Sequence, residues 1–374
     1  MMRTSSLKVL MVSTSYPENA QDWRGRFIFN MMNALARRDE IELSLWAPPG
    51  ELPDNVQDAA TPEDTLWLKR LSRQGGIAHI LKNRGILAAG TVIRLLARLG
   101  WCYRRQPVDV YHINWLQNAL PLWGTRPPAL ITVLGSDFGM LRLPGMTSLI
   151  RTVLRQRRAI LAPNAEWMRP ELERLFGDLA EICPIAFGVD DAWFTVKRRP
   201  QEGDRHWLAI TRLTRSKIGD LFDWGAGLFG DHRQLHLFGP MQEQIELPAW
   251  VQYHGATHPE ELLNTWFPQA CGLITLSRHD EGMPQVMLEA MAAGLPVIAS
   301  TLPAHQEIIN NGKTGMLVAS QQEFQAALDF LDERSSNDAL GAAAKAWVSE
   351  HIGTWDDCAG RYVASYRNLM ESRE

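Results

Sequence analysis

Short apolar runs of strand length recur along the first half of the chain and end in polar residues. They cover residues 7–13, 41–47, 108–114 and 129–137, and residues 27–37 between the first two runs place apolar side chains at helical spacing. Strands that alternate with helices are typical of an α/β fold with a parallel sheet. Gly25 lies in the loop between the first strand and the first helix, which predicts a doubly wound domain with its ligand at the carboxyl ends of the strands.

The second half of the chain shows the same pattern. Further apolar runs cover residues 207–211, 235–240, 251–255 and 272–277. Good helix formers dominate from Gln285 to Ala293. Because proline suits the first turn of a helix, we expect the helix to start near Pro284, and Gly294 with Pro296 ends it. Residues 296–299 then form a short apolar run that predicts a buried parallel strand.

Between the two halves, residues 195–205 read TVKRRPQEGDR, a charged stretch that Pro200 and Gly203 interrupt. This composition is typical of a linker between domains. A chain of 374 residues is long enough for two domains with a core each. We therefore expect an N-terminal Rossmann-like domain over residues 1–194 and a C-terminal one over residues 206–354.

The bulk composition narrows the class of protein. An apolar share of 45% and a charged share of 21% exclude a disordered or fibrous chain. The four cysteines show no metal-ligand spacing, which predicts apolar packing in a reducing compartment and no structural zinc. The apolar runs are shorter than a membrane span, and the N-terminal run does not end in a cleavage-like site. The cytoplasm is therefore the expected location.

Charge is divided unevenly along the chain. Residues 1–186 carry 23 Lys and Arg against 17 Asp and Glu, whereas residues 187–374 carry 15 against 25. Within the positive half, residues 75–105 combine apolar positions with the basic residues Lys82, Arg84, Arg94, Arg98, Arg104 and Arg105. A basic amphipathic segment can lie on an anionic membrane surface. It can equally be a surface helix that packs on its own sheet, and the sequence leaves both interpretations open.

Polar residues follow several of the predicted strands. His112, Asn114 and Asp137 lie at strand ends in the first half, where open α/β sheets bind their ligands. Arg212 and Lys217 follow the first strand of the second half. Cations in a loop are commonly only solvated, but a pair fixed at a strand end can also bind phosphate.

Residues 279–300, HDEGMPQVMLEAMAAGLPVIAS, contain two carboxylates eight positions apart, Glu281 and Glu289. If the segment is wholly helical, about 12 Å along the helix axis separates them, which suits a long ligand such as a nucleotide sugar. The N–H groups of residues 282–285 then lie at a helix start, where a diphosphate or a sugar hydroxyl binds well. The alternative is that both glutamates are solvated.

Glu281-Gly-Met-Pro followed by Leu288-Glu-Ala-Met-Ala-Ala-Gly-Leu-Pro-Val resembles the glutamate-x7-glutamate motif of the family-4 retaining glycosyltransferases. Arg212 and Lys217 are similar to the family's cation pair, which holds the donor diphosphate. The resemblance covers nearly the whole chain. It implies the GT-B fold, in which two Rossmann-like doubly wound domains face a central cleft, and a last helix within residues 355–374 that crosses back to the first domain.

The resemblance also implies roles for single residues. The donor would be bound by Gly25, Arg212, Lys217, Glu281, Gly282, Met283, Pro284 and Glu289, with Glu289 on the ribose and Glu281 on the transferred sugar. In the acceptor half the family patterns are altered, because His112-Ile-Asn114 replaces His-x-His and Thr132-Val-Leu134-Gly-Ser-Asp137 replaces Thr-x-His-Gly-x-Asp. His112, Asn114 and Asp137 remain the catalytic candidates there, together with Arg212, Lys217 and Glu281.

The implied activity is retaining, metal-independent transfer of a sugar from a UDP- or GDP-linked donor to a glycan or a lipid-linked saccharide, in cell-surface polysaccharide synthesis. Asp-x-Asp does not occur in the chain, so neither a metal nor another cofactor is expected, and nucleic acid is not an expected partner. Two alternatives remain open. One is a non-catalytic sugar- or nucleotide-binding protein of the same fold, and the other is a GT-B epimerase or phosphorylase. The expected location is cytoplasmic, with peripheral contact at the inner face of the membrane as the open question.

Overall fold

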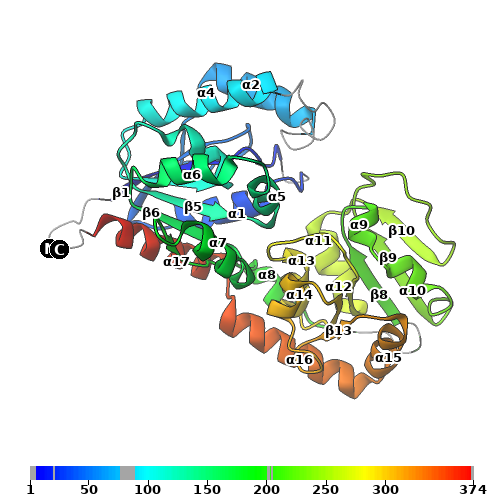
Figure 1. Cartoon of the computed structure of the whole chain (residues 1–374). Coiled ribbons are helices and arrows are strands. Elements are labelled where there is room, and N and C mark those ends of the chain that lie inside the picture. Colours follow the sequence, from blue (N-terminus) through cyan, green and yellow to red (C-terminus); the bar gives the residue numbers. More distant parts are fainter. Residues whose placement is uncertain (1–5, 20–21, 76–88, 200–202, 204, 372–374) are drawn as a thin grey trace. The chain divides into compact units, whose positions relative to one another are not determined.

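The computed structural model describes residues 6–19, 22–75, 89–199, 203 and 205–371. Contacts divide the chain into two compact units (Figure 1): unit 1 comprises Met1–Phe187 and Trp355–Glu374, and unit 2 comprises Gly188–Thr354. Each unit is built around its own parallel sheet. The predicted α/β fold class with two Rossmann-like sheets is confirmed.

The division between the units lies at residues 187 and 188, earlier than the residue 194 that the sequence suggested. The N–H of Val189 donates to the carbonyl of Gly353 at 3.1 Å. Helix α8 (Asp191–Phe194) packs on helix α13 (Gln285–Ala292), which also belongs to unit 2. These contacts attach residues 188–194 to unit 2, and a boundary drawn from composition does not register them.

The stretch that reads as a linker is docked on unit 2 in its described part. The side chain of Arg198 is only 12% exposed. Its guanidinium donates to the carbonyl of Gly294 at 3.0 Å and to Oδ1 of Asn337 at 2.6 Å. Arg198 of the predicted linker therefore packs on unit 2, while residues 200–202 and 204 lie outside the described residues.

Within the described residues, unit 1 contains a seven-stranded parallel sheet in the order β3-β2-β1-β4-β5-β6-β7. Its strands are β1 (Leu7–Val12), β2 (Ile41–Trp46), β3 (Gln57–Asp58), β4 (Val110–Asn114), β5 (Ala129–Val133), β6 (Ala159–Pro163) and β7 (Glu181–Ile182). The predicted strand over residues 129–137 is too long. Strand β5 ends at Val133 and helix α5 (Gly135–Leu141) follows, because the Asp137 carboxylate accepts the N–H of Leu134 at 2.8 Å and caps the first turn.

Helices cover both faces of the sheet of unit 1 (Figure 1). Besides α5 they are α1 (Arg26–Ala36), α2 (Pro62–Arg73), α4 (Ala89–Arg105), η2 (Leu116–Leu122), α6 (Met146–Leu154), η3 (Glu166–Met168), α7 (Arg169–Phe176) and α17 (Trp355–Met370). Successive residues of β4 point to opposite faces. The ring of Tyr111 lies 5.2 Å from that of Tyr103 on α4, whereas the ring of His112 lies 4.8 Å from that of Tyr362 on α17.

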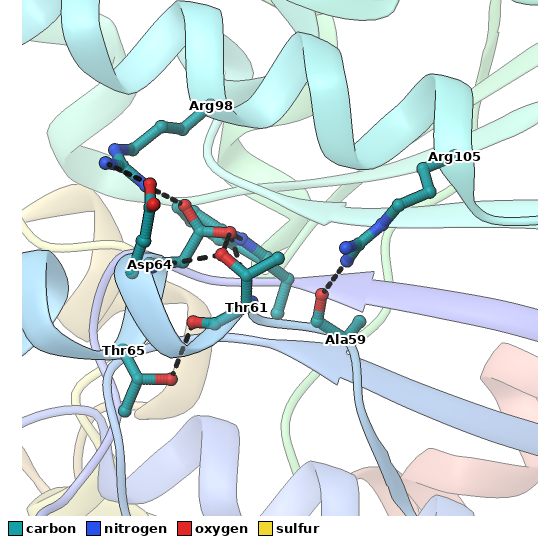
Figure 2. Close-up of polar contacts among 8 residues, drawn as sticks. Ala59, Thr61, Asp64, Thr65, Arg98 and Arg105 are labelled. Atoms are coloured by element: carbon teal, nitrogen blue, oxygen red, sulfur yellow. Dashed lines mark hydrogen bonds and ion pairs between the residues drawn. The ribbon is translucent and has the colours of Figure 1, made fainter.

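Helix α4 is tied to α2 and to the loop before it by arginine side chains (Figure 2). Arg98 forms an ion pair with the buried Asp64, and Arg105 donates to the carbonyl of Ala59 at 3.0 Å. The guanidinium of Arg98 also lies 5.5 Å from the centre of the Trp67 ring. These two arginines thus have partners inside unit 1, as the alternative of a packed surface helix requires.

The rest of the basic segment does not decide between membrane contact and packing on unit 1. Residues 76–88, with Lys82 and Arg84, lie outside the described residues. On α4, Ile93 is 67% exposed and Trp101 is 52% exposed. In the part of the chain that the structure describes, no helix is long and apolar enough to cross a membrane. Contact with a membrane surface stays a prediction.

Within the described residues, unit 2 contains a six-stranded parallel sheet in the order β10-β9-β8-β11-β12-β13. Its strands are β8 (Arg205–Ile210), β9 (Arg233–Phe238), β10 (Val251–Gly255), β11 (Ala270–Thr275), β12 (Val297–Ser300) and β13 (Met316–Val318). Besides α8 and α13, its helices are α9 (Arg215–Ile218), α10 (Leu221–Gly225), α11 (Pro259–Glu261), the π-helical η4 (Leu262–Trp266), α12 (Phe267–Gln269), α14 (Pro303–Ile308), α15 (Gln321–Asp332) and α16 (Arg334–His351). Strands β8 and β11 are neighbours at the centre, so the segments that follow them lie side by side.

Candidate functional site

Two segments at the carboxyl edge of the sheet of unit 2 carry the cations and the first glutamate of the sequence motif. We call residues 211–220 the β8 segment and residues 276–284 the β11 segment. Lys217 of the β8 segment forms an ion pair with Glu281 of the β11 segment, with 2.5 Å between Nζ and Oε1. Their side chains are only 12% and 15% exposed. Two residues that are 64 positions apart in the sequence are thus in direct contact.

Local sequence features hold Lys217 in place. Thr214 caps the short helix α9, and its hydroxyl accepts the N–H of Lys217 at 3.3 Å. Gly219 follows the helix with φ +56°, and a Cβ there would lie 1.8 Å from the carbonyl oxygen of Leu276. Only glycine allows the β8 segment to approach the β11 segment this closely.

A second ion pair joins the same two segments. Asp220 and Arg278 pair through both carboxylate oxygens, with 2.8 Å between Nε of Arg278 and Oδ2 of Asp220. The N–H of Arg278 also donates to the carbonyl of Ser216 at 2.8 Å. We call these contacts the Asp220–Arg278 clamp. The sequence does not predict it, because a distant Asp and Arg in two loops carry no pattern that would connect them.

Glu281 lies in a loop and not in a helix. Pro284 is the N-cap residue of α13, which begins at Gln285, so the two glutamates are not on one continuous helix and the separation of about 12 Å along a helix axis does not apply. Met283 and Pro284 are buried and Gly282 is half-buried. Within the described residues, no side chain caps α13, and its first turn presents backbone N–H groups to this end of the sheet.

Glu289 lies about one turn into α13, and its side chain is partly buried. Burial raises the pKa of this carboxyl to about 7, and the negative charge of Asp190 adds to the rise. Asp190 is itself the N-cap of α8 and accepts the N–H of Ala192 at 3.0 Å. At neutral pH the two forms of Glu289 are therefore both populated, which lets this residue either donate or accept a hydrogen bond.

The charges around Lys217 affect one another. Burial lowers the pKa of Lys217, the Glu281 carboxylate opposes this change, and the positive charge of Arg212 adds to it. Arg212 is exposed and lies in the same segment, where its carbonyl accepts the N–H of Thr214 at 2.9 Å. Burial also lowers the pKa of His279, with the charge of Lys217 as a further cause. The site is thus cationic, with Glu281 as the counter-charge of Lys217.

The buried His305 lies at the carboxyl end of β12. The Ser300 hydroxyl donates to the carbonyl of Ser277 at 2.6 Å, and Nδ1 of His305 lies 2.9 Å from the carbonyl oxygen of Ser300. Burial lowers the pKa of His305, and the charge of Glu281 opposes this change. These contacts tie β12 to the β11 segment. The sequence offered no motif that singles out His305.

In unit 1, the glycine of the first loop has a backbone role. Gly25 has φ +67° and precedes α1. A Cβ at this position would lie 2.7 Å from the backbone N of Tyr16, so glycine lets the start of α1 approach the segment that follows β1. Its predicted contact with the donor stays a prediction.

His112 is enclosed between the sheet and α17. Its Nε2 lies 2.9 Å from the Thr132 hydroxyl and its Nδ1 lies 2.6 Å from the Tyr366 hydroxyl. Burial lowers its pKa to about 3, so the imidazole is neutral. Since the side chain has no exposed surface and both ring nitrogens have partners, the structure shows a packing residue here and does not bring His112 to a ligand surface.

Asn114 and Asp137 are buried as well. The amide of Asn114 donates to the carbonyl of Val12 at 3.1 Å and joins β4 to β1. Asp137 caps α5, and burial raises its pKa to about 7, while hydrogen bonds from backbone N–H groups oppose the rise. Both residues lie at the carboxyl edge of their sheet as expected, but their side chains bond to the backbone of unit 1.

The four cysteines are free thiols, and three of them are fully buried. In the described part of the chain, no group of three or more His, Cys, Asp or Glu side chains is arranged to hold a metal ion. The predicted absence of a metal or another cofactor remains an expectation, which a direct test has to settle.

Part of the chain matches a known protein family, and several known proteins are similar to it. Residues 217–333, which include Lys217, Glu281 and Glu289, match the family described as "Glycosyl transferases group 1". A D-inositol 3-phosphate glycosyltransferase of Corynebacterium urealyticum is 30% identical over 131 residues, which cover 34% of this chain and 30% of that protein. A GDP-mannose-dependent alpha-(1-6)-phosphatidylinositol monomannoside mannosyltransferase of Mycobacterium tuberculosis is 22% identical, and the match covers 95% of this chain and 96% of that protein.

Solved structures show the same fold. A sucrose-phosphate synthase from Thermosynechococcus elongatus superposes with a TM-score of 0.72 at 16% identity, over 97% of this chain and 99% of that chain. The Anabaena protein HepE, in complex with UDP and glucose, superposes with a TM-score of 0.64 at 14% identity, over 97% of this chain and all of that chain (100%). The chain therefore has the GT-B fold, and its residues 217–333 match the glycosyl transferases group 1 family.

Proposed function

We propose that the protein is a retaining, metal-independent glycosyltransferase. It moves a sugar from a nucleoside-diphosphate sugar to a hydroxyl group of a glycan or a lipid-linked saccharide. The contact between Lys217 and Glu281 at the carboxyl edge of unit 2 carries this proposal. This contact supports the proposal because a cation suited to a diphosphate and a carboxylate suited to a sugar hydroxyl lie within one small site.

The proposed roles follow from charge and position. Arg212 and Lys217 neutralise the charge that grows on the departing diphosphate, a task for which fixed cations are effective. Glu289 accepts hydrogen bonds from the ribose hydroxyls. Glu281 and the backbone of residues 282–284 bind the transferred sugar, next to the uncapped start of α13.

The proposed reaction exchanges one bond at the anomeric carbon for another. The bond from this carbon to the diphosphate oxygen breaks, and the bond to the acceptor oxygen forms on the same face of the sugar. The acceptor proton passes to the departing phosphate oxygen. The burial of His112, Asn114 and Asp137 supports a proton path that uses the phosphate oxygen and none of these three side chains as the base. Arg212 and Lys217 provide the charge that a metal ion provides in other transferases.

The names of the relatives favour particular classes of donor and acceptor. The mycobacterial relative is named as GDP-mannose-dependent and acts on a phosphatidylinositol mannoside, while HepE binds UDP and glucose. Both support a UDP- or GDP-linked donor, and the first supports a lipid-linked acceptor in cell-surface glycan synthesis. The named relatives are transferases or synthases. They favour this activity over a GT-B epimerase, a phosphorylase or a non-catalytic binding protein.

The decisive experiment is a calorimetric titration of the protein with UDP, GDP, ADP and CMP, repeated on the Arg212→Ala/Lys217→Ala variant. We expect one nucleoside diphosphate to bind to the wild-type protein and the double variant to lose at least about 100-fold in affinity, since each cation makes a charge-assisted bond. Absence of binding by any of the four nucleotides to folded protein would contradict the proposal. Turnover that disappears on addition of EDTA would contradict its metal-independent part.

A further inference from the structure

We propose that the donor binds by exchanging ion-pair partners: Lys217 leaves Glu281 for the diphosphate, and Glu281 passes to a hydroxyl of the transferred sugar. Glu281 thereby distinguishes the nucleotide sugar from the bare nucleoside diphosphate, which is the product. This inference rests on the proposed function and adds a role for Glu281 in donor selection and product release.

Without a ligand, Lys217 and Glu281 are each other's ion-pair partner. Nζ of Lys217 and Oε1 of Glu281 are 2.5 Å apart, and both side chains are more than four-fifths buried. A phosphate oxygen that binds Lys217 has to take the place of this carboxylate oxygen or share the ammonium group with it. A carboxylate next to a diphosphate is a close contact between like charges, which costs binding free energy in a site that water hardly enters.

Among the described residues, Lys217 is the cation that forms an ion pair with Glu281. The charged and titratable groups that act on Lys217 are Glu281, Arg212, His279 and His305. Burial lowers the pKa of both histidines, so at neutral pH they are uncharged. Arg212 is the other cation proposed for the diphosphate. A diphosphate that engages both cations leaves the Glu281 carboxylate without compensation, and an uncompensated charge with little access to water is unfavourable.

A sugar removes this penalty, because its hydroxyl groups can donate hydrogen bonds to the released carboxylate. The complete donor therefore satisfies Lys217 and Glu281 together, whereas the nucleoside diphosphate satisfies only Lys217. After transfer, Glu281 competes again for Lys217 and favours release of the product. The Asp220–Arg278 clamp keeps the two segments together throughout the exchange.

The test compares the wild-type protein with Glu281→Gln, which keeps the shape of the side chain and removes its charge. The probes are UDP and UDP-glucose, or GDP and GDP-mannose if the guanine nucleotide is the one that binds. We expect the nucleoside diphosphate to bind to Glu281→Gln about tenfold more tightly than to the wild type. The nucleotide sugar should lose its advantage, so that the ratio of the two affinities falls towards one.

Two further variants serve as controls. Asp280→Asn removes the neighbouring carboxylate, which is exposed, and should leave the affinity for the nucleoside diphosphate within about twofold of the wild type, as expected for a solvated charge. Glu281→Asp retains the charge and should retain the weaker binding of the nucleoside diphosphate. A thermal melt of each variant shows that the fold is intact.

The pH profile provides a second readout. Because Glu281 opposes the lowering of the Lys217 pKa by burial, its removal lowers that pKa further. As the pH is raised, Lys217 should therefore lose its charge earlier in Glu281→Gln than in the wild type. The binding of the nucleoside diphosphate to this variant should weaken at a correspondingly lower pH. If folded Glu281→Gln binds the nucleoside diphosphate no more tightly than the wild type, the exchange is wrong while the proposed function stands. If the wild type binds none of the nucleotides, the proposed function itself fails.

Discussion

Glu289 shows how burial sets the charge of a single residue. Its carboxyl group lies partly buried on α13 beside Asp190, and its pKa is raised to about 7. The protonated form accepts fewer hydrogen bonds than the carboxylate. A residue proposed to bind ribose hydroxyls is thus only partly in its accepting form at neutral pH.

We expect donor affinity to rise as the pH increases from 6 to 8, since Glu289 becomes a carboxylate over this range. Glu289→Gln should bind the donor more weakly and lose this part of the pH dependence. The measurement is the dissociation constant of the nucleotide sugar at several pH values for both proteins. An identical pH profile in wild type and variant would remove Glu289 from the ribose site.

The raised pKa of Glu289 also predicts that the stability of the fold falls as the pH rises, whereas donor affinity should increase. Because the pKa of Glu289 in the folded state lies above its ordinary value of 4.5, the unfolded chain releases this proton first. The contribution of Glu289 to stability is therefore largest below pH 4.5 and is lost as the pH rises through 7. Glu289→Gln should raise the melting temperature relative to the wild type at pH 8 and change it less at pH 5. Differential scanning calorimetry at the two pH values checks this.

At the scale of elements, the site depends on two segments that approach closely at the carboxyl ends of β8 and β11. Thr214 caps α9, Gly219 removes the side chain that would collide with Leu276, and the Asp220–Arg278 clamp joins the segments. Each device is local, yet together they bring Lys217 to Glu281. We expect the site to be sensitive to changes in backbone conformation as well as to loss of its charges.

Gly219→Ala should lower the free energy of unfolding by about 3 kcal/mol or more, because a positive φ and a backbone clash act together. The variant should therefore unfold at a lower urea concentration. It should also weaken binding of the nucleoside diphosphate, since Lys217 shifts with the segment. Gly227→Ala is the matched control: Gly227 has φ +78°, but an added Cβ meets nothing within 4 Å, so only about 1–2 kcal/mol is expected. Equal losses in urea unfolding would exclude the clash as the cause.

In unit 1, the contact between α2 and α4 depends on one buried charge pair (Figure 2). Asp64 is 1% exposed, and Arg98 is its cation. Arg98→Ala should destabilise the protein by about 3 kcal/mol, because it leaves the carboxylate buried without a counter-charge. Arg94→Ala removes a guanidinium that lies 5.6 Å from the Trp67 ring and should cost less than about 1 kcal/mol.

The pH dependence of this pair gives an internal check. The pKa of Asp64 is lowered in the folded state, where hydrogen bonds from Arg98 and Thr61 outweigh the effect of burial. The contribution of Asp64 to the free energy of unfolding is present above the ordinary pKa of Asp. It is lost as the pH falls through the lowered pKa of the folded state. The difference in unfolding free energy between wild type and Arg98→Ala should therefore shrink in acid. A difference that stays constant with pH would indicate lost packing instead.

At the scale of the whole molecule, the chain builds its two units differently. Unit 2 is one continuous segment, whereas unit 1 needs the last helix of the chain. Helix α17 supplies Trp355, Tyr362 and Tyr366 to the core of unit 1, and the Tyr366 hydroxyl bonds to His112. The core of unit 1 is therefore incomplete until the C-terminus has been made.

We expect a fragment of residues 188–354 to unfold cooperatively on its own and a fragment of residues 1–187 to lack a cooperative transition. Addition of residues 355–374 to the second fragment through a flexible linker should restore its transition, because the buried face of α17 is returned to the core. Circular dichroism during urea titration measures all three. A cooperative transition in residues 1–187 alone would show that α17 is dispensable.

Much of the fold follows from the pattern of residues alone. The five strands predicted for unit 2 lie within two residues of their predicted bounds, since a buried parallel strand needs a continuous apolar run, while β13 (Met316–Val318) was not predicted. Glycine and proline mark the ends of α13 for local conformational reasons, and Gly294 has the expected positive φ of 75°. The order of Arg212, Lys217, Glu281 and Glu289 also pointed to the glycosyltransferases, whose group 1 family residues 217–333 match.

The alternation of strands and helices, the two-sheet α/β class and the residue types of the proposed donor site can be read from the sequence alone, because they depend on neighbours in the chain. The tertiary structure decided which side chains meet. It paired Lys217 with Glu281, enclosed His112 under α17, turned Asp137 into a helix cap and docked Arg198 on unit 2. Burial and contact depend on segments that are distant in sequence, and a pattern along the chain does not contain these distances.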